Sequence, residues 1–235
     1  MTLLGDAAVA MWWNVDEQNR VEFHEWHSKE HLPERLGIPG FRRGSRWKSA
    51  EEGAYFVLYE LESYDTLTSP PYLSRLNDPT PWSTKMMPLH RGMVRSQCRI
   101  LETSGYGLAT FMHTVRLSPL PGREGELRAF LSALVKRAPH LPGLTSAHLL
   151  RTETPATKPT REQEIRGGDA AADWILLVSG HTSDPWSSLL DGAGMENALD
   201  RAGAGNVALG EFSLMHAVTA NDVETVGRRA AGGAR

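Results

Sequence analysis

The sequence predicts an α+β protein in which two tandem βαββαβ repeats pack against each other, sheet to sheet, within one chain. The first observation is a pair of Pro-Gly turns, Pro39-Gly40 and Pro142-Gly143, each set in the same succession of strand-like and helical segments. The second is the composition, since 40% hydrophobic and 23% charged residues are ordinary for a soluble globular protein. The third follows from the repeat itself: a four-stranded sheet with helices on one face needs a cover for its other face, and a sister repeat supplies one.

The first repeat is expected to span residues 1–104. Short apolar runs bounded by turn residues predict strands, and a longer stretch between the first two runs predicts a helix. The second helical stretch is interrupted by prolines, which end or kink helices. In chain order we expect a strand at 7–15, a helix at 18–32, strands at 41–49 and 54–63, the interrupted helix at 67–87 and a strand at 93–101.

The second repeat is expected to span residues 105–220. Its first helix is the clearest in the chain, because Leu127, Phe130, Leu131 and Leu134 recur on one helical face. The βαββαβ order, found twice, is that of the ferredoxin-like motif. In chain order we expect a strand at 108–117, a helix at 123–137, strands at 144–152 and 172–181, a helix at 185–202 and a strand at 206–215.

Two further segments lie outside this pattern. Residues 153–171 are polar and rich in Pro and Gly, which predicts a mobile surface loop. Residues 221–235 hold Gly, Ala and Arg with few large apolar side chains, which predicts a flexible tail.

Charge and cysteine content exclude several classes of function. The net charge of −3 and the absence of a basic cluster argue against a nucleic-acid partner. The single cysteine, Cys98, cannot form an internal disulfide and is expected to be a buried, inert thiol. No apolar run approaches the ~20 residues of a membrane span, and the first residues do not read as a signal peptide, so a cytoplasmic protein is expected.

The first predicted helix carries three histidines where its sister carries apolar residues. Aligning the Pro-Gly turns places His24, His27 and His31 opposite Leu127, Phe130 and Leu134. Buried imidazoles need polar partners, so these rings are predicted to line a polar cavity between helix and sheet. A slip of one residue would instead put Phe23 and Trp26 in the core with His27 beside them. His27 and His31 are therefore the firmer candidates.

Imidazole serves as an acid or a base near neutral pH. We expect His31 to act in this way, with His27 orienting it and Tyr59 donating a hydrogen bond. Two histidines are too few ligands for a zinc site, so no metal is predicted. Further candidates for substrate binding are His24, Trp13, Trp26 and Trp82, the last in a Pro-rich stretch suited to a lid.

Arg95, Gln97 and Arg99 alternate along one strand and so share one face of the sheet. If that face meets the helices, Arg95 is placed to hold a carboxylate or phenolate of the substrate. If it faces the barrel interior, these side chains only form ion pairs there. The sequence leaves both placements open.

The run Phe23-x-x-x-His27-x-x-x-His31-Leu-Pro, followed by Ile38-Pro39-Gly40-Phe41, resembles the EthD-like branch of the dimeric α+β barrel superfamily. His31 matches the position of the family's histidine, whereas an aromatic residue is commoner at the position of His27. The resemblance implies a small-molecule enzyme whose site lies between sheet and helices. In the second repeat Leu134 replaces the histidine, which implies a structural role for that half.

Three functions follow as hypotheses. The first is a cofactor-independent enzyme of the cyclase, isomerase, decarboxylase or monooxygenase class, acting on an aromatic, polyketide-like or lactone substrate. The second is a haem protein with His27 or His31 as axial ligand. The third is a non-enzymatic binding protein whose histidines are structural. Because the halves satisfy each other's sheets, either a monomer with pseudo-dimeric halves or a homodimer is expected.

Overall fold

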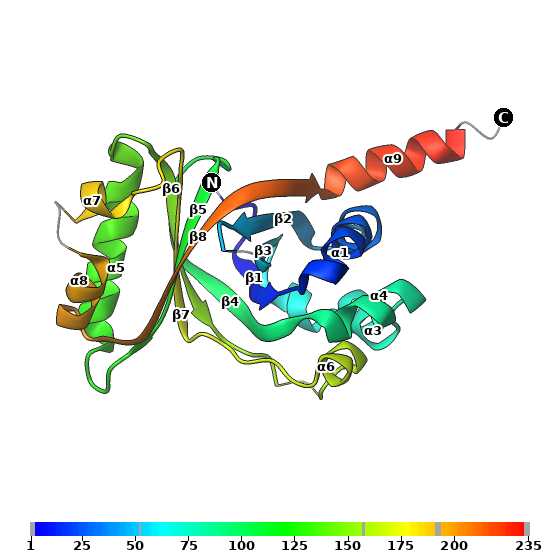
Figure 1. The fold of residues 1–235 in the computed structure, drawn as a ribbon, viewed down its shortest axis with the longest axis horizontal. Coiled ribbons are helices and arrows are strands. Elements are labelled where there is room, and N and C mark those ends of the chain that lie inside the picture. Colours follow the sequence, from blue (N-terminus) through cyan, green and yellow to red (C-terminus); the bar gives the residue numbers. More distant parts are fainter. Residues whose placement is uncertain (1–2, 52, 157, 191–193, 233–235) are drawn as a thin grey trace.

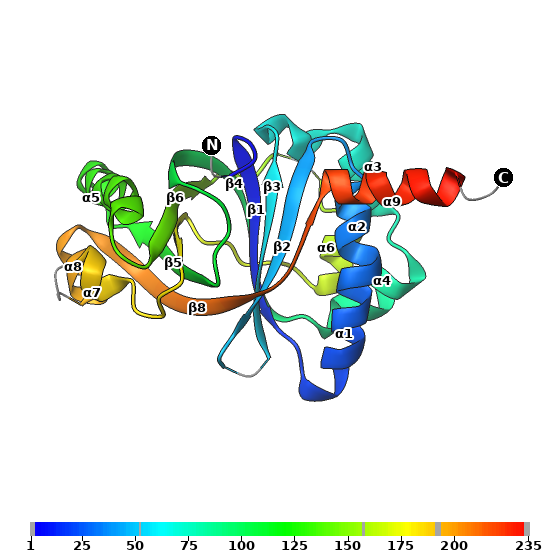
Figure 2. The same ribbon diagram turned by 90° about the horizontal axis from the view of Figure 1, so that it is seen from above.

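The computed structural model describes residues 3–51, 53–156, 158–190 and 194–232. Within them, eight strands form one closed antiparallel barrel in the order β1-β3-β2-β8-β5-β7-β6-β4. The helices lie outside the barrel, most of them in two groups at opposite ends of the molecule (Figures 1 and 2). The predicted tandem fold, two βαββαβ repeats closing sheet to sheet, is confirmed.

The first repeat forms one half of the barrel. Its strands are β1 (Ala7–Asn14), β2 (Phe41–Ser49), β3 (Ala54–Leu61) and β4 (Arg91–Gly105). The first helical stretch comprises α1 (Arg20–Trp26), a π-helical turn (His27–His31) and α2 (Leu32–Leu36). The Pro-rich stretch forms α3 (Pro70–Asn77) and α4 (Pro81–Met86), each with a proline in its first turn, where the missing N–H costs nothing.

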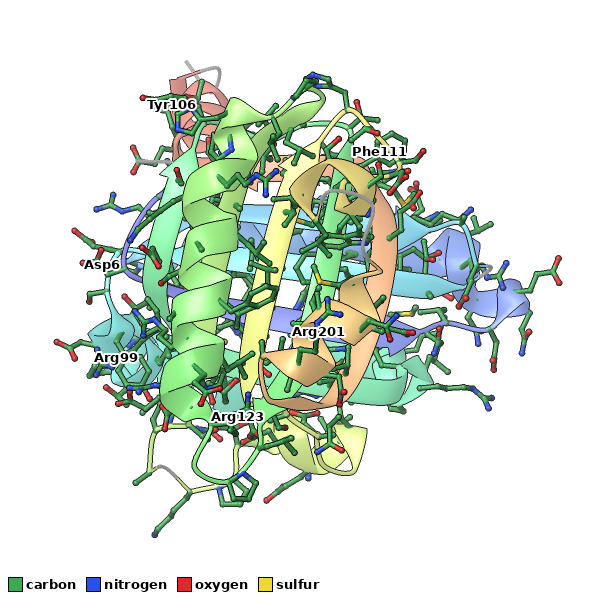
Figure 3. All side chains as sticks on the ribbon, turned by 90° about the vertical axis from the view of Figure 1, so that its left-hand side faces the viewer. Asp6, Arg99, Tyr106, Phe111, Arg123 and Arg201 are labelled. Atoms are coloured by element: carbon green, nitrogen blue, oxygen red, sulfur yellow. The ribbon has the colours of Figure 1, made fainter. Side chains whose placement is uncertain are left out.

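The second repeat forms the other half. Its strands are β5 (Phe111–Pro119), β6 (Leu144–Thr152), β7 (Trp174–Gly180) and β8 (Ala204–Thr219). Its helices are α5 (Glu124–Arg137), α6 (Arg161–Arg166), α7 (Trp186–Leu189) and α8 (Met195–Arg201). Figure 3 shows α5 and α8 lying across the strands of this half, and the guanidinium of Arg123 joins them by donating to the carbonyl oxygen of Arg201 at 2.9 Å.

Two strand pairs join the repeats and close the barrel. β2 pairs with β8, where Arg46 lies opposite His216, and β4 pairs with β6, where Arg99 lies opposite Arg151. Strand residues alternate between the two faces of the sheet. One face fills the barrel with side chains from both repeats, including those of Trp12, Trp47, Phe56, Met112, Ile175 and Leu177. The other face packs against the helices of its own repeat.

The prediction that residues 153–171 form a mobile surface loop was wrong. Helix α6 begins there after a capping box in which Thr160 and Gln163 satisfy each other's backbone groups. Thr160 and Glu162 are buried, and Ala170 forms a parallel bridge with Val94 of β4. The polar residues of the insertion thus have partners in the first repeat, although the insertion belongs to the second (Figure 1).

The segment predicted as a flexible tail is helical as far as the structure describes it. Helix α9 (Ala220–Gly232) continues from β8 and extends away from the barrel (Figure 1), and residues 233–235 lie outside the described part. Within the described residues, no helix is long and apolar enough to cross a membrane.

Candidate active site

The first helical stretch buries Phe23, His27 and His31 at four-residue spacing on the face that meets the sheet. In α5 the buried residues are Leu127, Leu131, Leu134 and Val135. The alignment that placed His24 and His27 opposite Leu127 and Phe130 was therefore wrong by one residue, whereas His31 and Leu134, which it also paired, are both buried. The alternative register, with Phe23 and Trp26 in the core and His27 beside them, is the one found.

The π-helical turn explains this offset. The first repeat carries one residue more than the second between its buried stripe and its Pro-Gly turn. A π-helical turn closes through i→i+5 hydrogen bonds, and here the N–H of Leu32 donates to the carbonyl oxygen of His27. The wider turn accommodates the extra residue and keeps both histidines directed at the sheet.

Three imidazoles meet between this turn and the sheet. The ring centroids of His27 and His31 are 5.5 Å apart, and His31 lies 4.4 Å from the indole of Trp26. The third is His90, just before β4, whose ring lies 4.7 Å from that of Trp13 and 5.8 Å from that of Trp26. His90 was not among the predicted site residues, because nothing in its local sequence distinguishes it from a surface histidine after a proline.

The polar atoms of this cluster are buried without hydrogen-bond partners among the described residues. They are Trp13 Nε1, His27 Nδ1, His31 Nδ1 and both ring nitrogens of His90. The hydroxyl of Tyr59, in the same hydrophobic core, is also buried without a described partner. Each such atom costs roughly 1–3 kcal/mol of folding free energy. So many together are unusual for a purely structural core, in which buried polar groups are paired.

Burial sets the protonation of the cluster. It lowers the pKa values of His27 and His31 well below the ordinary value, with Arg46 adding to the effect on His27 and Arg35 to that on His31. Burial also lowers the pKa of His90, to about 3. The three rings are therefore neutral at pH 7. Burial raises the pKa of Tyr59, which stays a hydroxyl and thus a potential donor.

A buried cation lies beside the histidines. Arg46 of β2 is 3% exposed, its guanidinium carbon is 5.6 Å from the ring centre of Phe23, and its Nη2 donates to Ser28 Oγ at 3.0 Å. No carboxylate among the described residues forms an ion pair with it, and burial lowers its pKa. Buried charges are normally paired. Arg46 was not among the predicted site residues, although its alternation with Gly44 on β2 places it on the helix face.

The insertion of the second repeat, residues 153–171 with helix α6, lies beside the cluster. Arg35 and Glu162, each with a side chain 4% exposed, form an ion pair between α2 and α6. Arg166 at the end of α6 pairs with Asp169 at 2.9 Å and lies 3.6 Å from Glu162. The positive charge of Arg166 also contributes to the lowered pKa values of His31 and His90, so the insertion influences the protonation of the site.

The other predicted aromatic and histidine residues take separate places. Trp13 and Trp26 pack against the imidazoles, and Trp26 Nε1 donates to Ser83 Oγ at 3.2 Å. His24 lies on the flank, where its Nε2 is 2.8 Å from the hydroxyl of Tyr55. Trp82 donates to Glu22 at 3.2 Å and so holds α4 against α1.

Arg95 and Gln97 lie on the helix face of β4, which resolves the two placements left open. Gln97 is opposite Val9, a residue of the core under the first repeat's helices, and Arg95 donates to the hydroxyl of Tyr72 at 2.9 Å. Both line a cavity of about 370 Å³ between α3 and the insertion. Arg99 instead pairs with Glu153 at 2.8 Å near the surface.

The surroundings of His27 bear on the predicted haem alternative. Among the described residues, no three His, Cys, Asp or Glu side chains are grouped to hold a metal ion. His27 is 1% exposed and its ring lies within 5.4–6.1 Å of the rings of Phe23, Trp26, His31 and Trp13. A haem bound to His27 would have to displace these aromatic neighbours.

No protein-family model and no curated protein matches the sequence. Several solved structures do match the fold. An anthrone oxidase-like protein superposes with a TM-score of 0.63 at 12% identity, covering 92% of this chain and 93% of its own. A candidate monooxygenase from Fusobacterium nucleatum superposes with a TM-score of 0.61 at 7% identity, covering 92% and 95%. A candidate monooxygenase from Lactobacillus acidophilus gives 0.55 at 8%, covering 92% and 97%.

Identities this low establish the fold alone. Together with the two βαββαβ repeats and the closed eight-stranded sheet, these likenesses show that the chain is a dimeric α+β barrel whose two halves are joined in one polypeptide.

Proposed function

We propose that the protein is a cofactor-independent enzyme that removes a proton from an aromatic, polyketide-like or lactone substrate in the cluster of His27, His31 and His90. The observation that carries the proposal is the group of buried imidazole nitrogens without hydrogen-bond partners, enclosed by indole rings. An unpaired neutral imidazole can accept a hydrogen bond or a proton from a bound substrate. Apolar walls with a few convergent polar groups are typical of small-molecule sites.

His31 is the proposed base, as the resemblance to EthD-like proteins also suggests. It takes a proton from an acidic C–H or O–H of the substrate, and the electron pair left behind moves onto a substrate oxygen. Arg46, which lacks a carboxylate partner, and the hydroxyl of Tyr59 stabilise that negative charge. His27, whose ring is 5.5 Å from that of His31, orients the base or the substrate. Ring closure, double-bond migration, loss of carbon dioxide or attack on molecular oxygen each begins from such an anion.

The structural comparisons support this proposal at a coarse level. The superposing proteins are an anthrone oxidase-like protein and candidate monooxygenases, so the fold is associated with enzymes of small molecules. Anthrones are aromatic ketones with an acidic methylene group, which makes them suitable first probes. We propose a small-molecule substrate as the only required partner and a cytoplasmic location.

The test is deuterium exchange at the acidic carbon of anthrone, followed by NMR without oxygen, and then with oxygen to detect oxidation. Aromatic acids and lactones form the rest of the panel. The wild-type protein is expected to accelerate exchange, the His31→Gln variant to lose most of that acceleration, and the exposed-residue control His140→Gln to keep it. Because the base has a lowered pKa, the rate is expected to stay constant from pH 8 down to well below 6.5.

Haem titration of the same three proteins and of His27→Gln supplies the opposing result. An intense absorption band that forms with the wild type and disappears in His27→Gln or His31→Gln would replace this proposal by a haem protein. Equal activity of His31→Gln and the wild type on every substrate of the panel would remove His31 as the base.

A further inference from the structure

A cavity of about 570 Å³ opens at one mouth of the barrel, where the β2–β3 hairpin leaves β8. Side chains of both repeats line it, among them Trp12, Asn14 and Tyr55 of the first and Arg116, Trp186 and Glu211 of the second. Its volume is within the range of small-molecule pockets. Nothing in the proposed proton-transfer chemistry uses it.

Arg116 of β5 is the cation of this cavity. It is half-buried, and its guanidinium carbon lies 5.0 Å from the centre of the Trp12 ring. Burial alone lowers its pKa, and no carboxylate among the described residues forms an ion pair with it. Half-buried guanidinium groups usually gain a carboxylate partner or full hydration. Among the described residues, the Arg116 guanidinium contacts only the π-face of Trp12, so an anion entering the cavity meets a cation that can donate several hydrogen bonds.

The aromatic surface beside Arg116 is held rigidly. The Trp12 ring stacks on Phe56 with centroids 4.9 Å apart, and its Nε1 donates to Thr114 Oγ1 at 3.3 Å. Gly210 of β8 follows the same wall, where a Cβ would come within 2.6 Å of Phe212 and 3.0 Å of Thr114 Oγ1. A fixed indole next to a cation favours a flat ligand that carries its charge at one end.

We propose that this mouth cavity is a binding site for an aromatic monocarboxylate, with the carboxylate on Arg116 and the ring system along Trp12. Glu51 and Glu211 are exposed residues of the cavity lining. They repel a second negative charge at the far end of the ligand, so monocarboxylates bind better than dicarboxylates of the same size.

The site is separate from the histidine cluster. Trp12 belongs to the core inside the barrel, whereas His27, His31 and His90 contact Trp13 and Trp26 on the helix face of the sheet. Trp13 lines the cavity and also touches His90, so the two places share one wall. Binding at the mouth does not depend on any catalytic role of the histidines.

The test is isothermal titration calorimetry of the full-length protein with 1-naphthoate, its neutral amide and naphthalene-1,4-dicarboxylate. We expect saturable 1:1 binding of the monocarboxylate, with the amide and the dicarboxylate each at least about tenfold weaker. Arg116→Met should lower the affinity for the monocarboxylate by at least about tenfold, and Arg116→Lys should lower it by less. The matched control Arg151→Met, which removes an arginine near Glu153 outside the cavity, should bind as the wild type does.

Thermal melts of each variant show that a loss of binding is not a loss of fold. If Arg116→Met melts at a lower temperature than the wild type, the proposal is tested instead by the ratio of the wild-type affinities for 1-naphthoate and its neutral amide. Equal binding of acid and amide, or undiminished binding by a folded Arg116→Met, overturns the proposal. His31→Gln should bind 1-naphthoate normally, so failure of the proposed enzyme and failure of this site give different results.

Discussion

At the scale of single residues, solvent exclusion rather than pairing determines the chemistry of the imidazoles. His27, His31 and His90 carry buried nitrogens with no described hydrogen-bond partner, and the positive charges of Arg46, Arg35 and Arg166 add to the effect of burial, although Glu34 Oε2 lies 3.9 Å from His31 Nδ1. Both influences disfavour the imidazolium. The cluster is therefore held in the state that a base requires, at a cost in folding free energy that the aromatic packing around it offsets.

This arrangement predicts a loss of stability in acid. Unfolded histidines titrate near 6.5, whereas burial lowers the pKa of folded His90 to about 3. The unfolded state thus binds more protons between these values, and stability is complete above 6.5 and decreases as the pH falls toward the folded pKa. Each such histidine contributes a slope of up to ~1.4 kcal/mol per pH unit. Urea unfolding from pH 7 to 5 should show a shallower decrease for His90→Gln, and an unchanged slope would contradict the assignment.

Arg46 is expected to influence His27 directly. Replacing it by Gln removes a positive charge that helps to lower the pKa of His27, so that pKa should rise, although burial keeps it below the ordinary value. NMR titration of ring-labelled histidine measures the shift. His113, in the second repeat, serves as an internal reference because Arg46 does not contribute to its lowered pKa. A His27 titration that does not move would exclude Arg46 as its neighbour in solution.

At the scale of elements, a close approach between α2 and the sheet positions the π-helical turn. Gly44 of β2 permits it, because a Cβ there would meet Leu32 at 2.7 Å, Tyr59 at 2.9 Å and Leu36 at 3.0 Å. Gly44→Ala should therefore destabilise the fold by about 1–3 kcal/mol, the usual cost of overpacking. Gly125→Ala in α5, where a Cβ has open space, should be neutral or stabilising. Chemical denaturation of the pair measures both.

One buried ion pair, between Arg35 and Glu162, joins the α6 insertion to α2 beside backbone contacts such as the bridge of Ala170 with Val94. Glu162→Gln removes the closer carboxylate of buried Arg35 and leaves it Glu34 at 3.9 Å, which should cost up to about 3 kcal/mol and loosen the insertion. Limited proteolysis should then cut the insertion faster. Glu164→Gln is the matched control, because its partner Arg161 is exposed and such pairs contribute little. Equal cleavage of both variants would show that other contacts hold the insertion in place.

At the scale of the whole molecule, the repeated strands and helices could be predicted from the sequence, whereas the contacts between the two repeats could not. The two Pro-Gly turns and the period of Leu127 and Leu131 predicted the tandem fold because local patterns encode strands and helices. The ion pair between Arg35 and Glu162, which are 127 residues apart, has no local signature. His90 joins His27 only through the closed fold for the same reason. The one-residue error in the helix arose because the alignment was anchored on the two Pro-Gly turns, and a π-helical turn that the sequence does not announce lies between Phe23 and the turn of the first repeat.

Closure of the barrel predicts that neither repeat is stable alone. Each would expose its inner apolar face, with Phe56 and Leu58 in the first and Ile175 and Leu177 in the second. Cutting the chain after Tyr106, which is 82% exposed, leaves both β4 and β5 whole. Separately expressed fragments 1–106 and 107–235 should aggregate or self-associate, whereas co-expressed fragments should form a 1:1 complex. Light scattering during size-exclusion chromatography distinguishes these states. A stable monomeric fragment would mean that the sheet needs no partner, and the tandem arrangement would then have to serve the site alone, by placing α6 of the second repeat over the histidines of the first.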